Sequence, residues 1–330
     1  MRALMYTGTN AMEIRDVPEP PLADGDVVLR IDAVGICGSD MHAYHGHDPR
    51  RVPPMILGHE FAATVVAGAG IGRRVTGNPL VTCGSCEFCV QGRNNLCANR
   101  TMIGMSRPGA FAERMAIPAS CLVELPDGLP PVKAALTEPA ATALHALNLS
   151  MRALVRPLPE CSTLILGGGA IGMLAALLVR HYGCRDVVVA ETNPLRRASL
   201  ERAAGCRTYD PRDGTPPREG TVDYVIDAVG AKATRNTALA TVKPGGVVMH
   251  IGLQDWASEI DLRRLTLAEI TLIGTYTYTT ADLRATVRAL AAGVFGDLAW
   301  VEERPLADGA RAFADLDAGR TAAAKVVLRP

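Results

Sequence analysis

Short runs of alternating hydrophobic and polar residues fill the first part of the chain, and Gly and Pro separate them. Alternation with a period of two is typical of strands that are buried on one face, and the Gly and Pro positions mark turns. Strands are predicted at residues 27–31, 61–67, 75–81 and 110–117. The pattern therefore predicts a partly open β-barrel with functional loops between its strands.

The pattern changes near Pro131, where an Ala- and Leu-rich segment predicts a helix over residues 132–148. Beyond it, strands and helices alternate. The predicted strands are 163–166, 186–190, 222–226 and 247–251, and the predicted helices are 170–182, 194–204 and 231–242. Alternation of this kind predicts an α/β fold in which helices cover both faces of a doubly wound parallel sheet.

The last segment holds a predicted helix over residues 280–292 and a predicted strand over residues 322–328. That strand resembles the first part of the chain more than the middle, so we expect the chain to return to its first domain. The predicted first domain comprises residues 1–145 and 277–330, and the predicted second domain comprises residues 146–276.

Charge and composition narrow the classes of function. The 330 residues are 48% hydrophobic and 21% charged, and 34 Lys and Arg balance 34 Asp and Glu. A neutral chain has no general attraction to nucleic acid or anionic lipid, so neither is an expected partner. The N-terminal residues lack the pattern of a signal peptide, and the apolar stretch 170–179 is too short to span a bilayer. We therefore expect a cytoplasmic protein.

Four cysteines with regular spacing form the sharpest local motif: Cys83, Cys86, Cys89 and Cys97. Four thiolates bind one Zn2+ tetrahedrally at distances of roughly 2.3 Å, and a closed set of this kind indicates a structural site. An iron–sulfur cluster is one alternative, since four cysteines also bind clusters, and four unrelated buried cysteines are another. Zinc ribbons that bind nucleic acid use the same ligands, but this segment contains no basic run.

A thiol, an imidazole and carboxyl groups form a second, mixed set. Cys37, His59 and Glu60 are its members, and Glu138 is a further acid at the start of the helix that leads into the second domain. Mixed ligands that leave one coordination position open are typical of catalytic zinc. The spacing alone also allows a core cysteine and a surface His–Glu pair.

A glycine-rich turn joins a predicted strand to the helix that begins at Ala170. Its pattern is G-x-G-x-x-G, and a strand before it and a helix after it are the context that dinucleotide binding requires. Gly167 would make the tight turn, Gly169 would let a pyrophosphate approach, and Gly172 would let helix and strand pack closely. The backbone of Ala170 and Ile171, at the helix N-terminus, is a predicted phosphate contact.

The next predicted strand ends at Glu191. An acid at this point accepts hydrogen bonds from a ribose diol and repels a 2′-phosphate, so NAD is predicted as the cofactor. Arg196 and Arg197 follow shortly afterwards, and arginines there can bind the extra phosphate of NADP. NADP therefore stays an alternative, and Arg196 is a predicted cofactor contact.

Taken in this order, the motifs resemble those of the zinc-containing medium-chain alcohol dehydrogenases. The chain is most similar to the branch of sorbitol, threonine and related polyol dehydrogenases, and the resemblance covers nearly all of it. The residues that carry it are Gly58-His59-Glu60, the four cysteines, Glu138-Pro139, the Gly167 turn, Lys243-Pro244-Gly245-Gly246 and Gly274-Thr275-Tyr276-Thr277-Tyr278.

The resemblance implies a GroES-like catalytic domain and a Rossmann domain, with the active site in the cleft between them. It implies that Cys37 and His59 bind a catalytic zinc, and that Glu60 and Glu138 are direct or exchangeable ligands. The four cysteines would hold a second, structural zinc. Two Zn2+ and NAD are therefore the expected cofactors.

The resemblance also implies roles near the catalytic zinc. Ser39 matches the hydroxyl that hydrogen-bonds the substrate alcohol, and His42 matches the histidine that passes the proton to solvent. Glu138 joins them as a catalytic candidate, and Asp40 matches an acid that orients a zinc ligand. Further predicted cofactor contacts follow the later strands, at Ala228, Ile251, Gly252 and Leu253.

The implied reaction is hydride transfer between NAD and a secondary alcohol. A small polyol or sugar-derived alcohol is favoured, since the low aromatic content of 4% argues against a bulky apolar substrate. The sugar-alcohol branch commonly has an Arg-Tyr pair where this chain has Thr277 and Tyr278, and often an aromatic residue where it has Ala43. The substrate therefore does not transfer directly from that branch.

Two alternative functions remain open. A threonine-type amino-alcohol dehydrogenase is the nearer one, and a zinc- and nucleotide-binding protein without catalysis is the other. Relatives of this type form dimers or tetramers through the edge of the Rossmann sheet, so a homodimer or homotetramer is expected. His45, His47 and Asp48 either line the substrate pocket or form a solvated loop.

Overall fold

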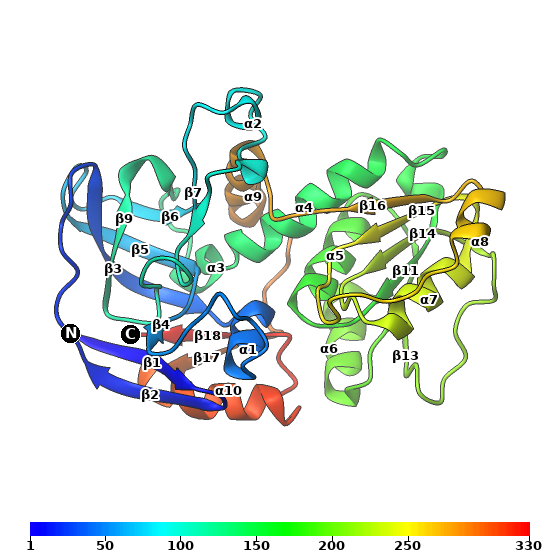
Figure 1. The fold of residues 1–330 in the computed structure, drawn as a ribbon. Helices are drawn as coiled ribbons and strands as arrows, with labels where there is room; N and C mark the ends of the chain where they lie inside the picture. Colours follow the sequence, from blue (N-terminus) through cyan, green and yellow to red (C-terminus); the bar gives the residue numbers. More distant parts are fainter.

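The chain folds around two groups of sheets in the computed structural model, which describes residues 1–330 (Figure 1). One group is mainly antiparallel and contains both ends of the chain, and the other is a parallel sheet built from the middle of the chain. The helix α4 (Thr137–Met151) runs from the first group towards the second (Figure 1). The predicted division at residue 145 therefore falls inside a continuous helix.

A seven-stranded sheet forms the centre of the first group, in the order β10-β6-β5-β3-β18-β17, with β9 also paired to β3. Its strands are β3 (Asp26–Gly35), β5 (Glu60–Ala67), β6 (Arg74–Gly77), β9 (Arg114–Pro118), β10 (Leu122–Glu124), β17 (Val301–Pro305) and β18 (Lys325–Arg329). Because β18 pairs with β3, the end of the chain lies beside one of its earliest strands. This pairing brings residues near 325 next to residues near 36.

Smaller elements complete this part. The short sheets consist of β1 (Arg2–Gly8), β2 (Ala11–Asp16) and β4 (Met55–Ile56), and of β7 (Leu80–Val81) with β8 (Thr101–Met102). Its helices are α1 (Gly38–Tyr44), α2 (Glu87–Val90), α3 (Pro131–Ala135), α9 (Thr280–Ala291) and α10 (Gly309–Asp317). An apolar core fills the space between the sheets, and Phe61, Phe111 and Phe313 are the largest of its fully buried side chains.

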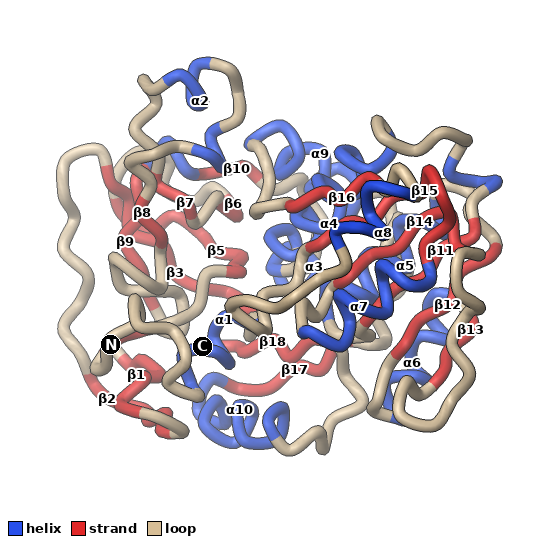
Figure 2. Tube along the Cα trace, turned by 45° about the vertical axis from the view of Figure 1, so that its right-hand side comes forward, coloured by secondary structure: helices blue, strands red, loops and turns tan.

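The parallel sheet has the strand order β13-β12-β11-β14-β15-β16. Its strands are β11 (Ser162–Leu166), β12 (Asp186–Ala190), β13 (Arg207–Tyr209), β14 (Val222–Asp227), β15 (Val242–His250) and β16 (Thr271–Gly274). Its helices are α5 (Ala170–His181), α6 (Pro194–Ala204), α7 (Lys232–Thr241) and α8 (Leu262–Leu267). Helices α4, α5 and α6 cover one face, and α7 and α8 cover the other (Figure 2). The prediction of a doubly wound α/β sheet is confirmed.

The strand order also places the cofactor region. It reverses between β11 and β14, and ligands of doubly wound sheets bind in the crevice at the carboxyl ends of the strands beside such a reversal. The glycine-rich turn follows β11 at this point. The glycine-rich motif and the strand order therefore both place the cofactor region at the same edge of the sheet.

Two predicted elements are interrupted in the structure. The helix predicted over 132–148 is two helices, α3 and α4, which meet at Leu136. Pro139 lies in the first turn of α4, where its missing N–H is tolerated, but it would break a continuous helix at that point. The strand predicted over 75–81 is split into β6 and β7, because Pro79 lacks the N–H that a continuous ladder needs.

A polar junction fastens α9 to α4. The carboxylate of Asp282 accepts a hydrogen bond from Asn148 at 2.9 Å and lies 2.8 Å from Nδ1 of His145, and it also accepts the hydroxyl of Thr279 at 2.6 Å. Burial alone would raise the pKa of Asp282, but the bonds from His145, Thr279 and Asn148 lower it to about 2. The junction therefore favours the charged form of Asp282.

We expect Asp282→Asn to lower the free energy of unfolding at pH 7 by about 1–3 kcal/mol. Because the native pKa lies below the ordinary value, the carboxylate stabilises the fold above about pH 4 and this contribution is lost as the pH falls towards 2. Urea unfolding of both proteins at several pH values measures this difference, which should shrink over that range. The exposed Asp24→Asn is the control, and a constant difference would contradict the assignment.

None of the helices combines the length and the apolar character that crossing a bilayer requires.

Candidate active site

The first cluster begins where β3 ends and α1 starts. Cys37 is the residue that precedes α1, and its N–H donates to the carboxylate of Asp40 at 3.0 Å. Ser39 and His42 lie three residues apart on α1 and therefore share one face of the helix. Burial lowers the pKa of His42, and the charges of His47, His45 and Arg51 lower it further. The start of α1 therefore carries the thiol of Cys37, the hydroxyl of Ser39 and the imidazole of His42, which are the groups predicted for this part of the site.

His59 and Glu60 enter the same cluster from the start of β5. Ligand atoms of Cys37, His59 and Glu60 all lie within 4.8 Å of one another, and both His59 and Glu60 are buried. Nδ1 of His59 is 3.6 Å from Asp40, which leaves Nε2 as the nitrogen available to a metal. Although burial opposes it, Asp40 and Cys37 raise the pKa of His59 well above its ordinary value. This donor set fits Zn2+, which accepts thiolate, imidazole and carboxylate ligands.

Glu60 has a cationic partner that the sequence analysis did not identify. Nζ of Lys325, on β18, lies 2.8 Å and 2.6 Å from the two carboxylate oxygens of Glu60, and it also donates to the carbonyl of Ile36 at 2.8 Å. Both side chains are almost fully buried, at 2% and 0% exposure. A Cβ at Gly35 would overlap this carboxylate, so a glycine is needed there. The pair fixes Glu60 beside Cys37 and His59.

Glu138 borders the cluster but does not belong to the group of three. It is buried in the first turn of α4, and burial raises its pKa to about 7 against the opposing charge of His59. Tyr278 is fully buried beside it, and burial together with the charge of Glu138 raises the pKa of the phenol well above its ordinary value. The structure therefore places Glu138 next to the predicted zinc ligands and places Glu60 among them.

The segment after α1 is only partly the solvated loop that its polar sequence allows. His47 is exposed, and His45 lies 2.7 Å from Asp317 of α10. Asp48, in contrast, is buried and forms an ion pair of 2.9 Å with Arg51, whose side chain is 1% exposed. Asp48 therefore belongs to a buried ion pair and not to the rim of an open loop.

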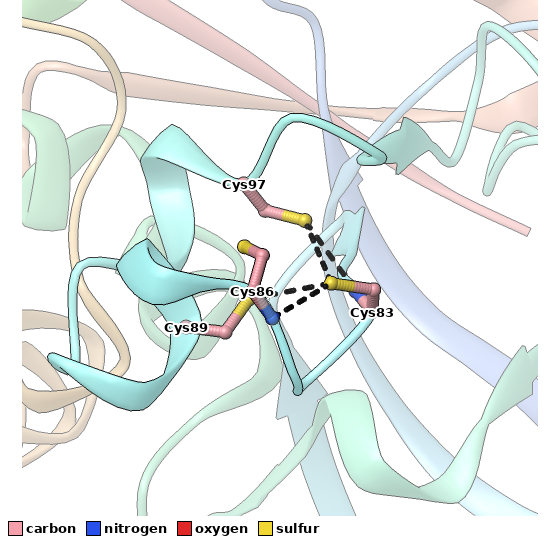
Figure 3. A group of neighbouring side chains, drawn as sticks. All are labelled: Cys83, Cys86, Cys89 and Cys97. Carbon is pink, nitrogen blue, oxygen red and sulfur yellow. Dashed lines mark hydrogen bonds between the residues drawn. The ribbon is translucent and has the colours of Figure 1, made fainter.

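The four cysteines converge in a lobe around α2 (Figure 3). All four Sγ atoms lie within 4.8 Å of one another; that of Cys83 is 3.5 Å from that of Cys97 and 4.0 Å from that of Cys89. Tetrahedral zinc with four thiolates places the sulfur atoms about 3.8 Å apart. N–H groups of Ser85 and Cys86 lower the pKa of Cys83 to about 5, which favours the thiolate that a metal requires. The cluster fits one tetrahedral zinc.

The lobe is fastened to the segment that leads out of the parallel sheet. Asn95 donates to the carbonyl of Tyr276 at 2.8 Å, and Asn94 accepts the N–H of Thr280 at 3.1 Å. The guanidinium of Arg100 lies 4.8 Å from the centre of the Tyr276 ring. Because Tyr278 follows two residues later, the lobe supports the chain beside Glu138.

The glycine-rich turn has the geometry that dinucleotide binding requires. Gly167 has a φ of +93°, which side chains rarely allow, and a Cβ at Gly172 would overlap the carbonyl of Gly167. A Cβ at Gly169 would meet nothing within 4 Å, so the space in front of this residue is open to a ligand. The backbone of Ala170 and Ile171 forms the first turn of α5 there. The residues present therefore fit a bound pyrophosphate.

Glu191 faces this turn. Its carboxylate accepts the N–H of Gly168 at 2.8 Å and that of Asn193 at 2.7 Å, and the side chain is buried. Nε of Arg196 is buried without a hydrogen-bond partner, whereas Arg197 donates to the carbonyl of Glu191 and to Asp210. Of the two arginines, Arg196 is the one whose guanidinium makes no hydrogen bond.

The remaining predicted cofactor contacts lie at the same edge of the sheet. Ala228 follows β14 and donates to the carbonyl of Leu166 at 3.0 Å, directly before the glycine-rich turn. Ile251 and Gly252 follow β15 and both donate to the carbonyl of Asp227. Leu253 is 70% exposed. These backbone bonds bring the ends of three strands together around one edge.

Known families match both parts of the chain. Residues 23–127 match the alcohol dehydrogenase GroES-like domain, and residues 170–292 match the zinc-binding dehydrogenase family. An L-threonine 3-dehydrogenase of Edwardsiella ictaluri (strain 93-146) is 33% identical over 278 residues, which are 79% of this chain and 80% of that protein. The chain belongs to the zinc-binding alcohol dehydrogenase family. The predictions of a GroES-like domain with a Rossmann domain, of an NAD(P)-linked alcohol dehydrogenase and of zinc as a cofactor are confirmed.

Solved structures agree over the full length of the chain. An NADP-bound structure from Sinorhizobium meliloti 1021, assigned as a zinc-binding dehydrogenase, is 31% identical with a TM-score of 0.85, and the match covers 100% of this chain and 99% of that one. The L-idonate 5-dehydrogenase of Escherichia coli K-12 is 25% identical with a TM-score of 0.85, and the match covers 100% and 98%. This zinc-binding dehydrogenase therefore shares its whole architecture with both of these proteins.

Two buried cations of the dehydrogenase escaped the sequence analysis. Lys325 interrupts the apolar run of the last strand, and a lysine buried there requires an acidic partner, so the sequence held a signal for it. Arg51 stands beside Arg50 and before two prolines, in a segment that reads as a polar loop. No sequence signal distinguishes the two arginines, since only the fold decides which of them is buried.

Proposed function

We propose that this enzyme oxidises a small, polar secondary alcohol with NAD. The cluster of Cys37, His59 and Glu60 is the observation that carries the proposal, because it offers a soft thiolate, an imidazole and a carboxylate within 4.8 Å. The parallel sheet supplies the glycine-rich turn for the dinucleotide. A member of this family that retains both features has a site for the metal and a site for the dinucleotide, and hydride transfer from an alcohol requires both.

Each residue of the cluster has a proposed part. Zn2+ supplies a Lewis acid and NAD a hydride acceptor when they are bound. Cys37, His59 and either Glu60 or Glu138 would hold the catalytic zinc, and Asp40 would orient His59 through Nδ1. Cys83, Cys86, Cys89 and Cys97 would hold the structural zinc.

The chain's own residues would then move the proton. As Ser39 accepts the proton of the substrate hydroxyl, it would donate its own proton onward to His42, on the same face of α1, which passes a proton to solvent. Burial and neighbouring cations lower the pKa of His42, so the imidazole is neutral and able to accept a proton near pH 7. Ser39 and His42 form the proposed relay.

The proposed cofactor is NAD. The carboxylate of Glu191 lies against the glycine-rich turn, where its charge repels the 2′-phosphate of NADP. Arg196 retains unused donors nearby and favours the opposite choice. Glu191 outweighs Arg196 in this choice, because the carboxylate of Glu191 is fixed by two backbone N–H groups.

The proposed substrate is a polyol or a sugar-derived alcohol. Ser39, Glu138 and Tyr278 surround the cluster with polar groups, which suit a substrate that carries further hydroxyl groups. The solved L-idonate 5-dehydrogenase supports this choice. A threonine-type amino alcohol is the second candidate, since the L-threonine 3-dehydrogenase of Edwardsiella ictaluri is 33% identical.

Formation of NADH with a panel of polyols, sugar acids and L-threonine tests the proposal. We expect NAD-dependent turnover of at least one polyol or sugar-derived alcohol by protein that contains two zinc ions per chain. Preference for L-threonine would select the second candidate. No turnover of any alcohol by such protein would contradict the proposal and would favour a binding protein without catalysis.

We also propose a homodimer or homotetramer that assembles through β16. This strand pairs only with β15, so its other edge is open, and Leu272 of β16 and the nearby Leu267 are 42% and 71% exposed. Sedimentation of Leu267→Glu against the unchanged chain tests this. A cytoplasmic location is supported by the nine cysteines, which are all free and of which four have metal-type spacing. The division of the chain at residues 145/146 and 276/277 stays a proposal.

A further inference from the structure

Arg51 occupies an unusual place for an arginine. Its side chain is 1% exposed, and its guanidinium lies against the segment of α1 that carries Ser39. The hydrogen bonds that hold it run to three different parts of the chain. Nε donates to the carbonyl of Gly104 at 3.2 Å, and Nη1 donates to the carboxylate of Asp48 at 2.9 Å and to the carbonyl of Ser39 at 3.0 Å.

One further hydrogen bond of Arg51 goes to the side chain of Ser39, a member of the proposed relay. Nη2 donates to the hydroxyl oxygen of Ser39 at 3.2 Å. A serine hydroxyl has two acceptor lone pairs and one hydrogen, and a guanidinium can only donate. Arg51 therefore takes up one lone pair of Ser39 and leaves the second lone pair and the hydrogen available to other partners.

These remaining positions are the two that a relay needs. A substrate hydroxyl must donate to Ser39, and Ser39 must donate its own hydrogen onward for the proton to leave. Because Arg51 cannot accept a hydrogen, the hydroxyl of Ser39 cannot turn its hydrogen towards Arg51 and out of the relay. The carbonyl bond from Nη1 fixes the backbone of Ser39 at the same time.

We infer that Arg51 is a positioning residue for proton transfer, which acts by orienting the hydroxyl of Ser39 towards the substrate. The inference rests on the proposed role of Ser39. Asp48 in turn orients Arg51, and Asp48 is itself held by Arg50, whose Nε and Nη2 donate to the two carboxylate oxygens at 2.9 Å and 3.0 Å.

The substitution Arg51→Met tests the inference in the zinc-loaded enzyme. The variant keeps much of the volume of the side chain, and Asp48 keeps its bonds to Arg50, so no buried carboxylate is left unpaired. We expect kcat to fall about 10- to 100-fold, as for the loss of orientation of a reacting group. The KM for NAD and the zinc content should stay unchanged, and the solvent deuterium isotope effect on kcat should rise because proton transfer becomes rate-limiting.

Arg50→Met is the matched control. Arg50 binds the same carboxylate but makes no bond to Ser39, and its side chain is 63% exposed. We expect its kcat to stay within about twofold of the unchanged enzyme. Arg51→Lys, which restores one donor, should recover part of the lost kcat. A loss in Arg50→Met equal to that in Arg51→Met would assign the effect to the loop and overturn the inference.

A double-mutant cycle separates this inference from the proposed function. If Arg51 acts through Ser39, adding Arg51→Met to Ser39→Ala should lower kcat no further. Full additivity of the two losses would overturn the inference and leave the role of Ser39 intact. Full activity of Ser39→Ala would instead overturn the proposed relay itself, and the inference with it.

Discussion

The substitution Cys37→Ser should abolish turnover and reduce the zinc content from two ions per chain to one. Cys37 supplies the thiolate of the mixed cluster, and its ligand atom lies within 4.8 Å of those of His59 and Glu60. A bound metal contributes several kcal/mol of transition-state stabilisation, and each 1.4 kcal/mol is a factor of ten in rate. We therefore expect kcat to fall about a thousandfold or more. Elemental analysis and NADH formation on one preparation measure both effects.

Cys97→Ser is the matched control for this prediction. It removes a buried thiol from the other cluster, so it should also reduce the zinc content to one ion per chain. Its main consequence should be a loss of stability, because structural zinc contributes directly to folding free energy. Cleavage by protease between Cys83 and Cys97 should become faster. Both variants should thus lose one zinc ion per chain, but Cys37→Ser should mainly lose turnover and Cys97→Ser should mainly lose stability.

Comparison of Cys37→Ser with Cys97→Ser shows whether the mixed cluster is the catalytic centre. If Cys37→Ser keeps two zinc ions and normal turnover, the mixed cluster is not the catalytic centre. Cys121→Ser provides a further comparison, since Cys121 is buried in the same part of the chain but belongs to neither cluster. It should keep two zinc ions.

Local motifs of the dehydrogenase could be predicted because their function depends on short-range geometry. The four cysteines lie close together in sequence, and only tight turns are needed to bring them around one metal. The glycine-rich turn could be predicted for the same reason, since Gly167 requires a positive φ and Gly172 a close approach to the turn. Strands and helices around it alternate visibly in the hydrophobic pattern.

The spatial arrangement of the two acids around Cys37 and His59 could not be predicted in the same way. Glu60 and Glu138 were equal candidates in the sequence, and only the fold separates them. β18 returns beside β3 and places Lys325 on Glu60, whereas Glu138 meets Tyr278 at the start of α4. Both pairings join residues far apart in the chain. Periodicity carries no information about partners at that separation.

The substitution Lys325→Met should lower the free energy of unfolding by about 3–5 kcal/mol. Lys325 and Glu60 are both buried, and removal of one member of such a pair leaves an uncompensated charge in the interior. Lys325→Met/Glu60→Gln should recover much of this loss, because no buried charge is then left unpaired. Denaturant unfolding of the unchanged chain, the single variant and the double variant measures both effects. A single variant as stable as the unchanged chain would show that the pair is not formed in solution.

The same variant tests whether Glu60 can bind the zinc. Without Lys325, the carboxylate of Glu60 is free to turn towards the nearby Cys37 and His59 and to be neutralised by the metal. If Glu60 is a ligand, the loss of stability in Lys325→Met should be smaller in the zinc-loaded protein than after the catalytic zinc has been removed by a chelator. If Glu60 does not reach the metal, its carboxylate stays unpaired in both states, and the two losses should be equal. The difference between the two losses therefore measures the coordination of Glu60, independently of turnover.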